Sequence, residues 1–392
     1  MKKSRYGILG IFANYFLGTT LLIINPALDG IAAMFPEIPY GTVLLLATAP
    51  NLVVAFTSLL IGEIAGKKFS YRAISVVAGV GLVATGIMPF LLRNFWMILV
   101  CRILFGFFVG LATPLGNALI MRLYDGQERA KMLGIGSAMM CVAGIFYQII
   151  SGKTAVSDPR NAWLTHLIIL IPTILILLFM PNVRDDQAEA SCISGQTEKA
   201  GKLPGAVYLL SVVFGITFMA FYPLMLNMSS IVTVRHLGDA AVSGNILTMY
   251  SLGGALGGFA FGLLNQKAGK WTIPVLYALL AGGLGICAVS DSVIFLMIGT
   301  FCTGAAVFML SSAILDKVAE YVPQHQSAKA SGMMMAIWNL GTFLSSFYVS
   351  LIIRVTGTDN PTMPVIAAAM IELILLVGWW VYSASTTRIT KS

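Results

Sequence analysis

The chain has 392 residues, of which 58% are hydrophobic and 10% are charged, and its mean hydropathy is +0.87. Soluble domains carry about a quarter of their residues as charged side chains, so an ordinary soluble protein is excluded and a multi-pass membrane protein is expected. The formal net charge of +8 does not call for nucleic acid as a partner, because the basic residues lie in loops beside apolar runs, as membrane topology requires.

A helix that spans a bilayer needs about 20 mostly apolar residues. Twelve such runs follow one another, at residues 7–34, 41–62, 73–92, 95–121, 131–152, 162–181, 205–230, 241–263, 272–290, 293–315, 328–353 and 362–384. The first run is too long for a secretory signal peptide and has no small-residue cleavage site, so we interpret it as a membrane helix. We expect an all-α membrane protein with twelve transmembrane helices.

Basic residues are divided unequally between the two sides that these runs define. Eighteen Lys and Arg lie on the side of the termini and five on the other, while Arg102 lies inside the fourth run. Cytoplasmic loops carry the excess of basic residues, so both termini are expected in the cytoplasm and the protein in the cell (inner) membrane. The only long polar segment, residues 182–204, is interpreted as a flexible cytoplasmic linker between a bundle at 1–181 and a bundle at 205–392.

The two halves repeat features at one offset. Arg102-Ile-Leu-Phe-Gly106 aligns with Thr300-Phe-Cys-Thr-Gly304 at an offset of 198, and the same offset places residues 127–134 over residues 325–332. Two separate features at one offset indicate an internal duplication, from which many transporters are built.

A basic turn after the second run of each half carries a family resemblance. The turns read Gly62-Glu-Ile-Ala-Gly-Lys-Lys-Phe and Gly262-Leu-Leu-Asn-Gln-Lys-Ala-Gly-Lys. With the two six-helix halves, the central loop and Arg102-x-x-x-Gly106-x-x-x-Gly110, they resemble the major facilitator superfamily over essentially the whole chain. The resemblance implies two pseudo-symmetric six-helix bundles and alternating access.

The basic turns depart from the family pattern. The family's acidic residue, which helps to latch the outward-facing state, is Gly66 in the first copy and Gln266 in the second, and Phe69 replaces a family glycine. The latch is therefore expected to be weakened, or Glu63 supplies a displaced substitute. The residues expected to form this conformational gate are Gly62, Glu63, Lys67, Gly262, Lys267 and Gly269.

Arg102 and Asp29 are the leading functional candidates. Arg102 lies about 10 Å along its helix from the outer side, where an unpaired guanidinium is costly, so it faces a cavity or a partner. Asp29, near the outer end of the first run, either exchanges a proton and alternates with pairing to Arg102, or caps an extracellular turn. For Arg102 the alternative is a scaffold role in which it bonds backbone carbonyls.

Polar and aromatic side chains are frequent in the runs that line the cavity of the resembling family. They predict a pocket for an amphipathic organic solute, although each could instead join helices by hydrogen bonds. The expected substrate-binding residues are Asn14, Tyr15, Asn25, Arg102, Asn117, Tyr147, Gln148, Phe218, Tyr222, Asn227, Tyr250, Ser311, Trp338 and Asn339. Glu372, in the last run, is interpreted as structural, and Asp316 with Lys317 as an ion pair at the membrane interface.

These observations predict a secondary transporter that moves a small organic solute by proton-coupled alternating access. Export is favoured, although the fifth run lacks the Gly-Pro pattern common among drug–proton antiporters of the resembling family. The alternatives are uptake or uniport of an organic anion with Arg102 as its ligand, and a membrane sensor without flux. No enzyme motif, metal-ligand spacing or cofactor motif is found, and the expected partners are the solute, protons and the lipid bilayer around a monomer.

Overall fold

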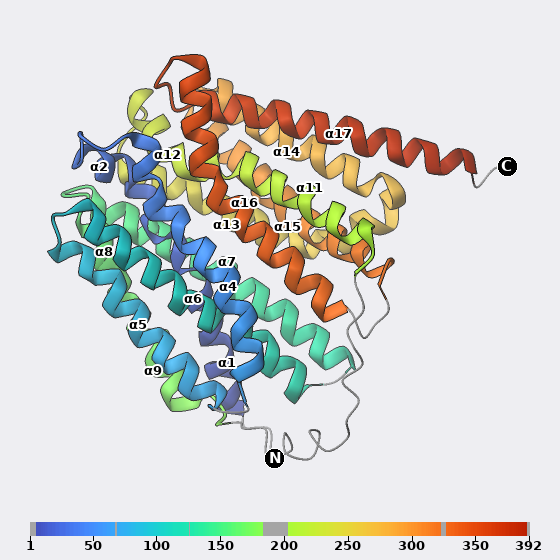
Figure 1. Cartoon of the computed structure of the whole chain (residues 1–392), viewed down its shortest axis with the longest axis horizontal. Coiled ribbons are helices and arrows are strands. Elements are labelled where there is room, and N and C mark those ends of the chain that lie inside the picture. The colour runs from blue at the N-terminus through green and yellow to red at the C-terminus, as the bar shows by residue number, and fades with distance from the viewer. Residues whose placement is uncertain (1–4, 67–68, 125, 183–202, 323–326, 390–392) are drawn as a thin grey trace.

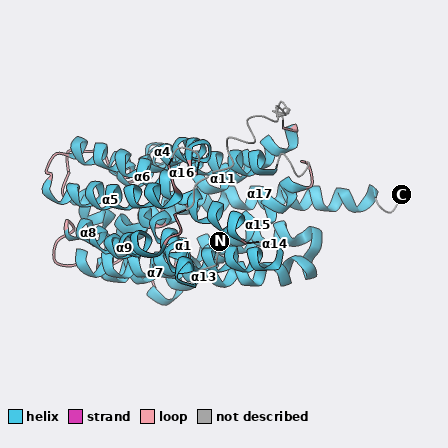
Figure 2. Ribbon diagram, turned by 90° about the horizontal axis from the view of Figure 1, so that it is seen from below, coloured by secondary structure: helices cyan, strands magenta, loops and turns pink. Residues whose placement is uncertain are grey.

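The computed structural model describes residues 5–66, 69–124, 126–182, 203–322 and 327–389. Within these residues the chain is helical except for loops and one isolated bridge between Ala65 and Phe69 (Figure 2). The predicted linker at 182–204 lies almost wholly outside the described residues.

The helices before the linker are α1 (Arg5–Gly18), the 3-10 helix η1 (Thr20–Ala27), α2 (Leu28–Ala33), α3 (Tyr40–Val43), α4 (Leu45–Ile64), α5 (Tyr71–Leu91), α6 (Phe95–Leu123), α7 (Gly126–Ala155), α8 (Asn161–Leu164), η2 (Thr165–Ile169) and α9 (Leu170–Phe179). Those after it are α11 (Gly205–Phe221), α12 (Pro223–Val234), α13 (Ala240–Ala268), η3 (Gly269–Trp271), α14 (Thr272–Val289), α15 (Val293–Ala319), α16 (Ser327–Thr356) and α17 (Met363–Ile389).

Every predicted apolar run lies on helical segments, but the structure does not confirm the count of twelve. By length and apolar composition, nine helical stretches of the described chain could cross a membrane, or ten if residues 7–33 form one span bent by 41°. The stretch Ala240–Val289 counts once although η3 separates α13 from α14, and Leu45–Ser58 is shorter than the required length. The all-helical membrane class is confirmed.

Local sequence explains where several helices begin. The side chains of Ser70, Asn94 and Asp239 precede α5, α6 and α13, and each accepts hydrogen bonds from backbone N–H groups of the first turn. These caps satisfy donors that a helix start otherwise leaves without partners. Pro26 has no N–H to donate and its ring crowds the carbonyl four residues earlier, which disfavours a regular α-helix through η1, whereas the bend between α1 and η1 lies at Thr19.

The repeated glycines of the two halves lie at equivalent helix crossings. A Cβ on Gly106 would lie 2.4 Å from the Pro50 carbonyl oxygen, and one on Gly304 would lie 2.1 Å from the Tyr250 carbonyl oxygen. Gly106 thus brings α6 against α4, as Gly304 brings α15 against α13, and small residues permit such close packing in membranes. The offset of 198 found in the sequence therefore recurs as a repeated packing contact.

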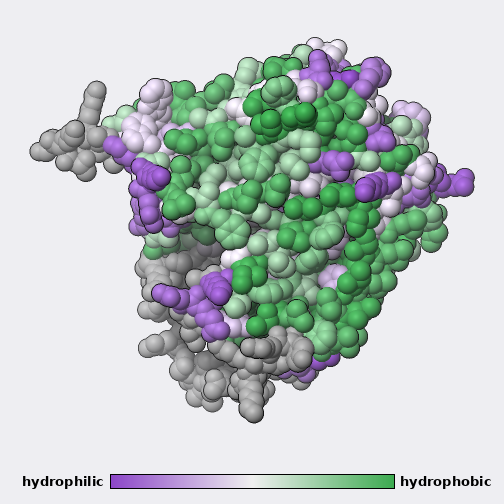
Figure 3. Space-filling model, turned by 180° about the vertical axis from the view of Figure 1, so that it is seen from behind, coloured by the Kyte–Doolittle hydropathy of each residue, from purple (hydrophilic) through white to green (hydrophobic). Residues whose placement is uncertain are grey.

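The helices before and after the linker touch at one end of the molecule and diverge toward the other (Figure 1). At the end that we call the closed end, α4 packs on α16, α7 on α13, and α2 on α12. Thr48 Oγ1 donates to Ser346 Oγ at 3.1 Å and Ser229 Oγ donates to the Pro26 carbonyl at 2.8 Å. The opposite end, where α9 ends and α11 begins, is called the linker end. Apolar side chains cover most of the face in Figure 3, as contact with lipid requires.

Candidate transport site

Arg102 lies on α6, fully buried between α4 and the α8–η2 segment. Its Nε donates to the Leu46 carbonyl at 2.7 Å, and its Cζ lies 4.4 Å from the centre of the Phe105 ring and 5.8 Å from that of Trp163. Nη1 and Nη2 have no hydrogen-bond partner among the described residues. Arg102 therefore has part of the predicted scaffold role, because it bonds one backbone carbonyl. Its two terminal nitrogens remain available for another group.

Polar groups from three further elements surround this guanidinium. His166 on η2 is buried, directs Nδ1 toward the Trp163 carbonyl at 2.9 Å, and has no partner at Nε2 within the described chain. Tyr222, which lies between α11 and α12, interacts electrostatically with Arg102 and lies against Asn25 of η1. The site therefore combines the broken first span with residues from both halves, an arrangement typical of transporter binding sites.

Asp29 belongs to a neighbouring network at the closed end. Ser230 Oγ lies 2.7 Å from Asp29 Oδ1 and 3.0 Å from the Tyr40 hydroxyl, which lies 3.1 Å from Asn227 Oδ1. Asn227 Nδ2 donates to the Pro361 carbonyl at 3.0 Å. No ion pair joins Asp29 to Arg102 in this conformation, so their alternation remains a prediction.

The remaining predicted substrate residues fall into three groups. Phe218, Tyr222, Tyr250 and Trp338 lie in a chain of aromatic contacts, with Phe218 and Trp338 ring centres 4.9 Å apart. Tyr147 and Gln148 are buried near the contact of α7 with α13, and their polar side-chain atoms have no partners among the described residues. Side chains that bond helix backbone or another predicted residue are Asn14, Tyr15, Asn117, Ser311 and Asn339.

The predicted gate can be described only in part. Lys67 lies outside the described residues, and the burial of Gly62 and the side chain of Glu63 are not described either. Gly66 has a φ of 82°, so the turn favours glycine where the family pattern has an acid. Gly262 and Lys267 are exposed on α13, and Gly269 ends that helix with a φ of 52°.

Two acidic residues lie away from this site. Glu372 on α17 is fully buried, and neither carboxyl oxygen has a partner within the described chain. The expected ion pair of Asp316 with Lys317 is wrong, because Lys317 Nζ pairs with Glu320 Oε2 at 2.7 Å. Neighbouring residues on a helix point in different directions, whereas residues three apart share a face.

Sequence reasoning did not select His166, Tyr40 or Ser230. His166 carried a usable signal, since it is the only one of the three histidines inside an apolar run. Tyr40 and Ser230 carried none, because their roles depend on contact between segments about 190 residues apart.

Comparisons with known proteins agree with this architecture. A family model described as Major Facilitator Superfamily matches residues 7–199 and 207–391. A probable sugar efflux transporter of Helicobacter pylori is 22% identical over 372 residues, covering 91% of each chain. A lysosomal dipeptide transporter, MFSD1 of Danio rerio, is 23% identical over 330 residues, covering 79% of this chain and 71% of that protein.

Solved structures show the same fold. The nucleoside transporter NupG superposes with a TM-score of 0.77 at 11% identity, covering 95% of this chain and 99% of that one. A D-xylose–proton symporter superposes with a TM-score of 0.76 at 13% identity, covering 95% and 96%. With a family model that spans nearly the whole sequence, the chain belongs to the major facilitator superfamily of multi-pass membrane transporters.

Proposed function

We propose that this secondary transporter exports a small organic solute in exchange for protons, with Asp29 as the residue that carries the proton. The observation behind this proposal is the hydrogen-bonded network at the closed end, which links Asp29 of the first half to Ser230 and Asn227 of the second. A group that titrates within such a contact couples its protonation to the closing of that end.

A proton on Asp29 would complete the hydrogen bonds of this network. Three contacts between oxygens connect Asp29, Ser230, Tyr40 and Asn227, and each hydrogen bond needs one proton. The hydroxyls of Ser230 and Tyr40 supply two, and Asn227 supplies none because the atom in contact is its acceptor Oδ1. When Ser230 donates to Asp29, Tyr40 can donate to Ser230 or to Asn227 but not to both, and a proton on Asp29 would supply the missing donor.

Few other titratable groups face Asp29. Of the elements packed against α2, namely η1, α3 and α12, only α3 carries one, and it is Tyr40. The loop that reaches α2 at Gly30 adds Asp158 and Arg160, which flank Pro159. We therefore propose Asp29 as the group that takes up a proton at the closed end.

Export follows if the linker end is cytoplasmic, as the basic residues predict. A proton taken up from outside then stabilises the closed end and opens the cytoplasmic side, where the solute binds and the proton leaves. The inward proton gradient thus drives the solute outward. The likeness to sugar efflux transporters supports export, and the likeness of fold to a proton symporter is compatible with proton coupling.

The test uses purified protein in liposomes that contain a pH-sensitive dye, challenged with panels of anionic, cationic and neutral solutes. We expect one class to move protons, and Asp29→Asn to abolish that movement while the labelled solute still equilibrates. Glu37→Gln, an exposed carboxylate in the adjacent loop, is the matched control and should behave as the unmodified protein. Unchanged proton movement in the Asp29→Asn variant would overturn the proposal.

A second candidate is the uptake or uniport of an organic anion. The two terminal nitrogens of Arg102 without partners favour it, because a guanidinium binds a carboxylate or phosphate through two parallel hydrogen bonds. Arg102 is fully buried here, so an anion reaches it only after a conformational change.

A further inference from the structure

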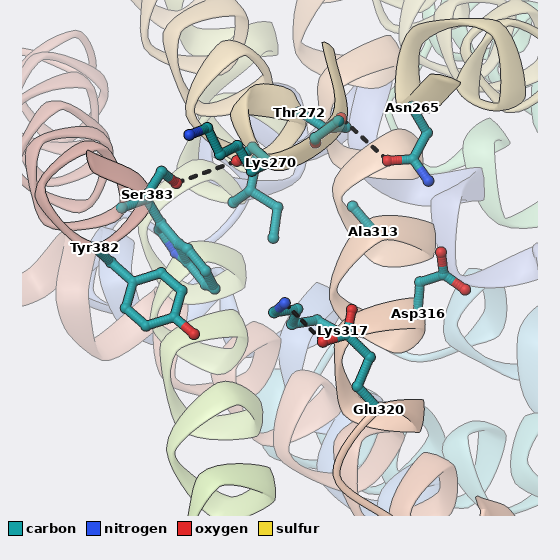
Figure 4. A pocket seen from close by; sticks show the side chains of 12 residues that line it. Asn265, Lys270, Thr272, Ala313, Asp316, Lys317, Glu320, Tyr382 and Ser383 are labelled. Carbon is teal, nitrogen blue, oxygen red and sulfur yellow. Dashed lines mark hydrogen bonds and ion pairs between the residues drawn. The ribbon is translucent and has the colours of Figure 1, made fainter. Parts of the chain in front are cut away.

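A polar pocket of about 340 Å³ lies near the linker end of the second half, away from Arg102 and Asp29. It is bounded by the end of α13, η3, the start of α14, the last turns of α15, and α17 (Figure 4). Its volume falls in the usual range of small-molecule sites. Its lining includes Gly269 of the predicted gate, but none of the residues proposed to carry the proton or the solute.

The charged groups of the polar pocket balance one another. Lys270 and Lys317 supply two positive charges, and Asp316 and Glu320 supply two negative charges. Lys317 is paired with Glu320, whereas Asp316 has no hydrogen-bond or ion-pair partner among the described residues. A ligand that carries both a cation and an anion matches this lining better than a purely anionic one.

An apolar groove of about 400 Å³ adjoins the polar pocket. It lies between α11 and α17, where Leu209, Val213, Ile374 and Gly378 line it. The groove and the polar pocket share three residues, Lys317, Trp379 and Tyr382. Trp and Tyr are enriched where a membrane protein passes from lipid tails to headgroups, and Lys often spans that boundary with its apolar stem.

We propose that the polar pocket and the apolar groove together bind one membrane phospholipid with a primary amine in its headgroup, such as phosphatidylethanolamine. The ammonium lies at Asp316, the phosphate lies toward Lys270 and Lys317, and one acyl chain fills the groove between α11 and α17. The lipid holds α17 against the rest of the second half, because few of the residues in its apolar span are buried within the protein. This site is independent of the proposed transport function.

Headgroup selectivity is the first test. The full chain is purified, stripped of lipid, and exposed separately to phosphatidylethanolamine, its trimethylated analogue phosphatidylcholine, and phosphatidylglycerol, with retention of each lipid counted by native mass spectrometry. We expect phosphatidylethanolamine to be retained about two- to fivefold more than either of the others, as one partly exposed ion pair provides. Equal retention of the three, or preference for phosphatidylglycerol, overturns the proposal.

Variants test the two parts of the site separately. Asp316→Asn should remove the preference for the primary amine, while Glu37→Gln at the closed end should not. Gly378→Leu should lower retention of all three lipids about fivefold or more, because its side chain fills the groove. Gly282→Leu is the matched control, since Gly282 is an exposed position of α14 outside the groove and its Cβ would meet open space. Retention that is unchanged in Gly378→Leu, or lowered equally by both leucine variants, contradicts the proposed groove.

Discussion

Arg102 combines one structural hydrogen bond with two terminal nitrogens that have no partner among the described residues. Its Nε is committed to the Leu46 carbonyl, and its ring contacts with Phe105 and Trp163 fix the plane of the guanidinium. The two nitrogens that remain have a fixed fork geometry. Lysine cannot bond the Leu46 carbonyl and also offer a planar fork to a ligand, because its ammonium is a single charge centre.

Arg102→Lys therefore separates the two candidate functions. If the solute is an organic anion held by Arg102, the variant keeps its charge and its fold but binds the anion about tenfold more weakly or worse, since a charge-assisted hydrogen bond contributes about 1.5–3 kcal/mol. The measurement is the concentration of labelled anion that gives half-maximal counterflow in liposomes. Normal affinity for anions in this variant would count against the organic-anion candidate, whereas a neutral solute should be unaffected.

The candidate site was only partly predictable from single residues. Arg102 and Asp29 stood out because charge inside an apolar run is costly. Asn14 and Asn339 were equally visible, yet they bond the Ala112 and Met335 carbonyls and join or stabilise helices. Pattern alone does not separate these cases, because the partner of a polar side chain depends on which helix lies opposite.

At the scale of helices, the length of the apolar runs predicted where helical segments lie. It did not predict where irregular backbone interrupts them. The run 205–230 became α11 and α12, and the run 7–34 became α1, η1 and α2, with breaks at Tyr222 and near Pro26. Proline in a membrane helix permits a kink without requiring one, so only the structure shows that η1 interrupts the span. The repeat at an offset of 198 was predictable because it rests on glycines that must pack closely.

Arg235 shows how one residue ends two helices, α12 through its backbone N–H and α14 through its side chain. It lies just after α12 and donates from Nη1 and Nη2 to the carbonyls of Cys287, Ala288 and Ser290 at the end of α14. The last carbonyls of a helix have no partner within it and carry partial negative charge, so a cation there is stabilising. An ion pair with Asp291 at 3.4 Å adds little, because the Asp291 side chain is 82% exposed.

We therefore predict that Arg235→Gln lowers the free energy of unfolding by about 2 kcal/mol, because three carbonyls lose a charged donor. The apparent melting temperature in detergent should fall clearly. Asp291→Asn removes the ion pair alone and should change stability by less than about 0.5 kcal/mol. Equal effects of the two substitutions would show that the ion pair, and not the helix end, is the stabilising contact.

At the scale of the whole molecule, the two halves meet closely at the closed end. A Cβ on Gly244 of α13 would lie 2.5 Å from the Gln148 carbonyl oxygen of α7, and one on Gly152 would lie 2.6 Å from the Ala240 carbonyl oxygen. Backbone atoms cannot rotate away as flexible side chains do. Contact between the halves at this end therefore requires small residues at both positions.

Gly244→Val should consequently favour the conformation in which the closed end is open. Overpacking of this kind costs about 1–3 kcal/mol, which shifts an equilibrium between two conformations by about five- to 150-fold. Spin labels on Ser157→Cys and Asp359→Cys, exposed positions in loops of the two halves, should report a longer distance. Gly258→Val, on the same helix with open space around its Cβ and outside the predicted gate, should leave the distance unchanged.

The same variant tests the proton-coupling argument at the scale of the molecule. If protonation of Asp29 stabilises the closed end, lowering the pH should shorten the distance between labels in the unmodified background and should do so less in Gly244→Val, where closure is opposed by packing. The response should disappear in Asp29→Asn, which cannot gain a proton at that position. A pH response that persists in Asp29→Asn would place the proton on another group and leave Asp29 with the structural role of capping its turn.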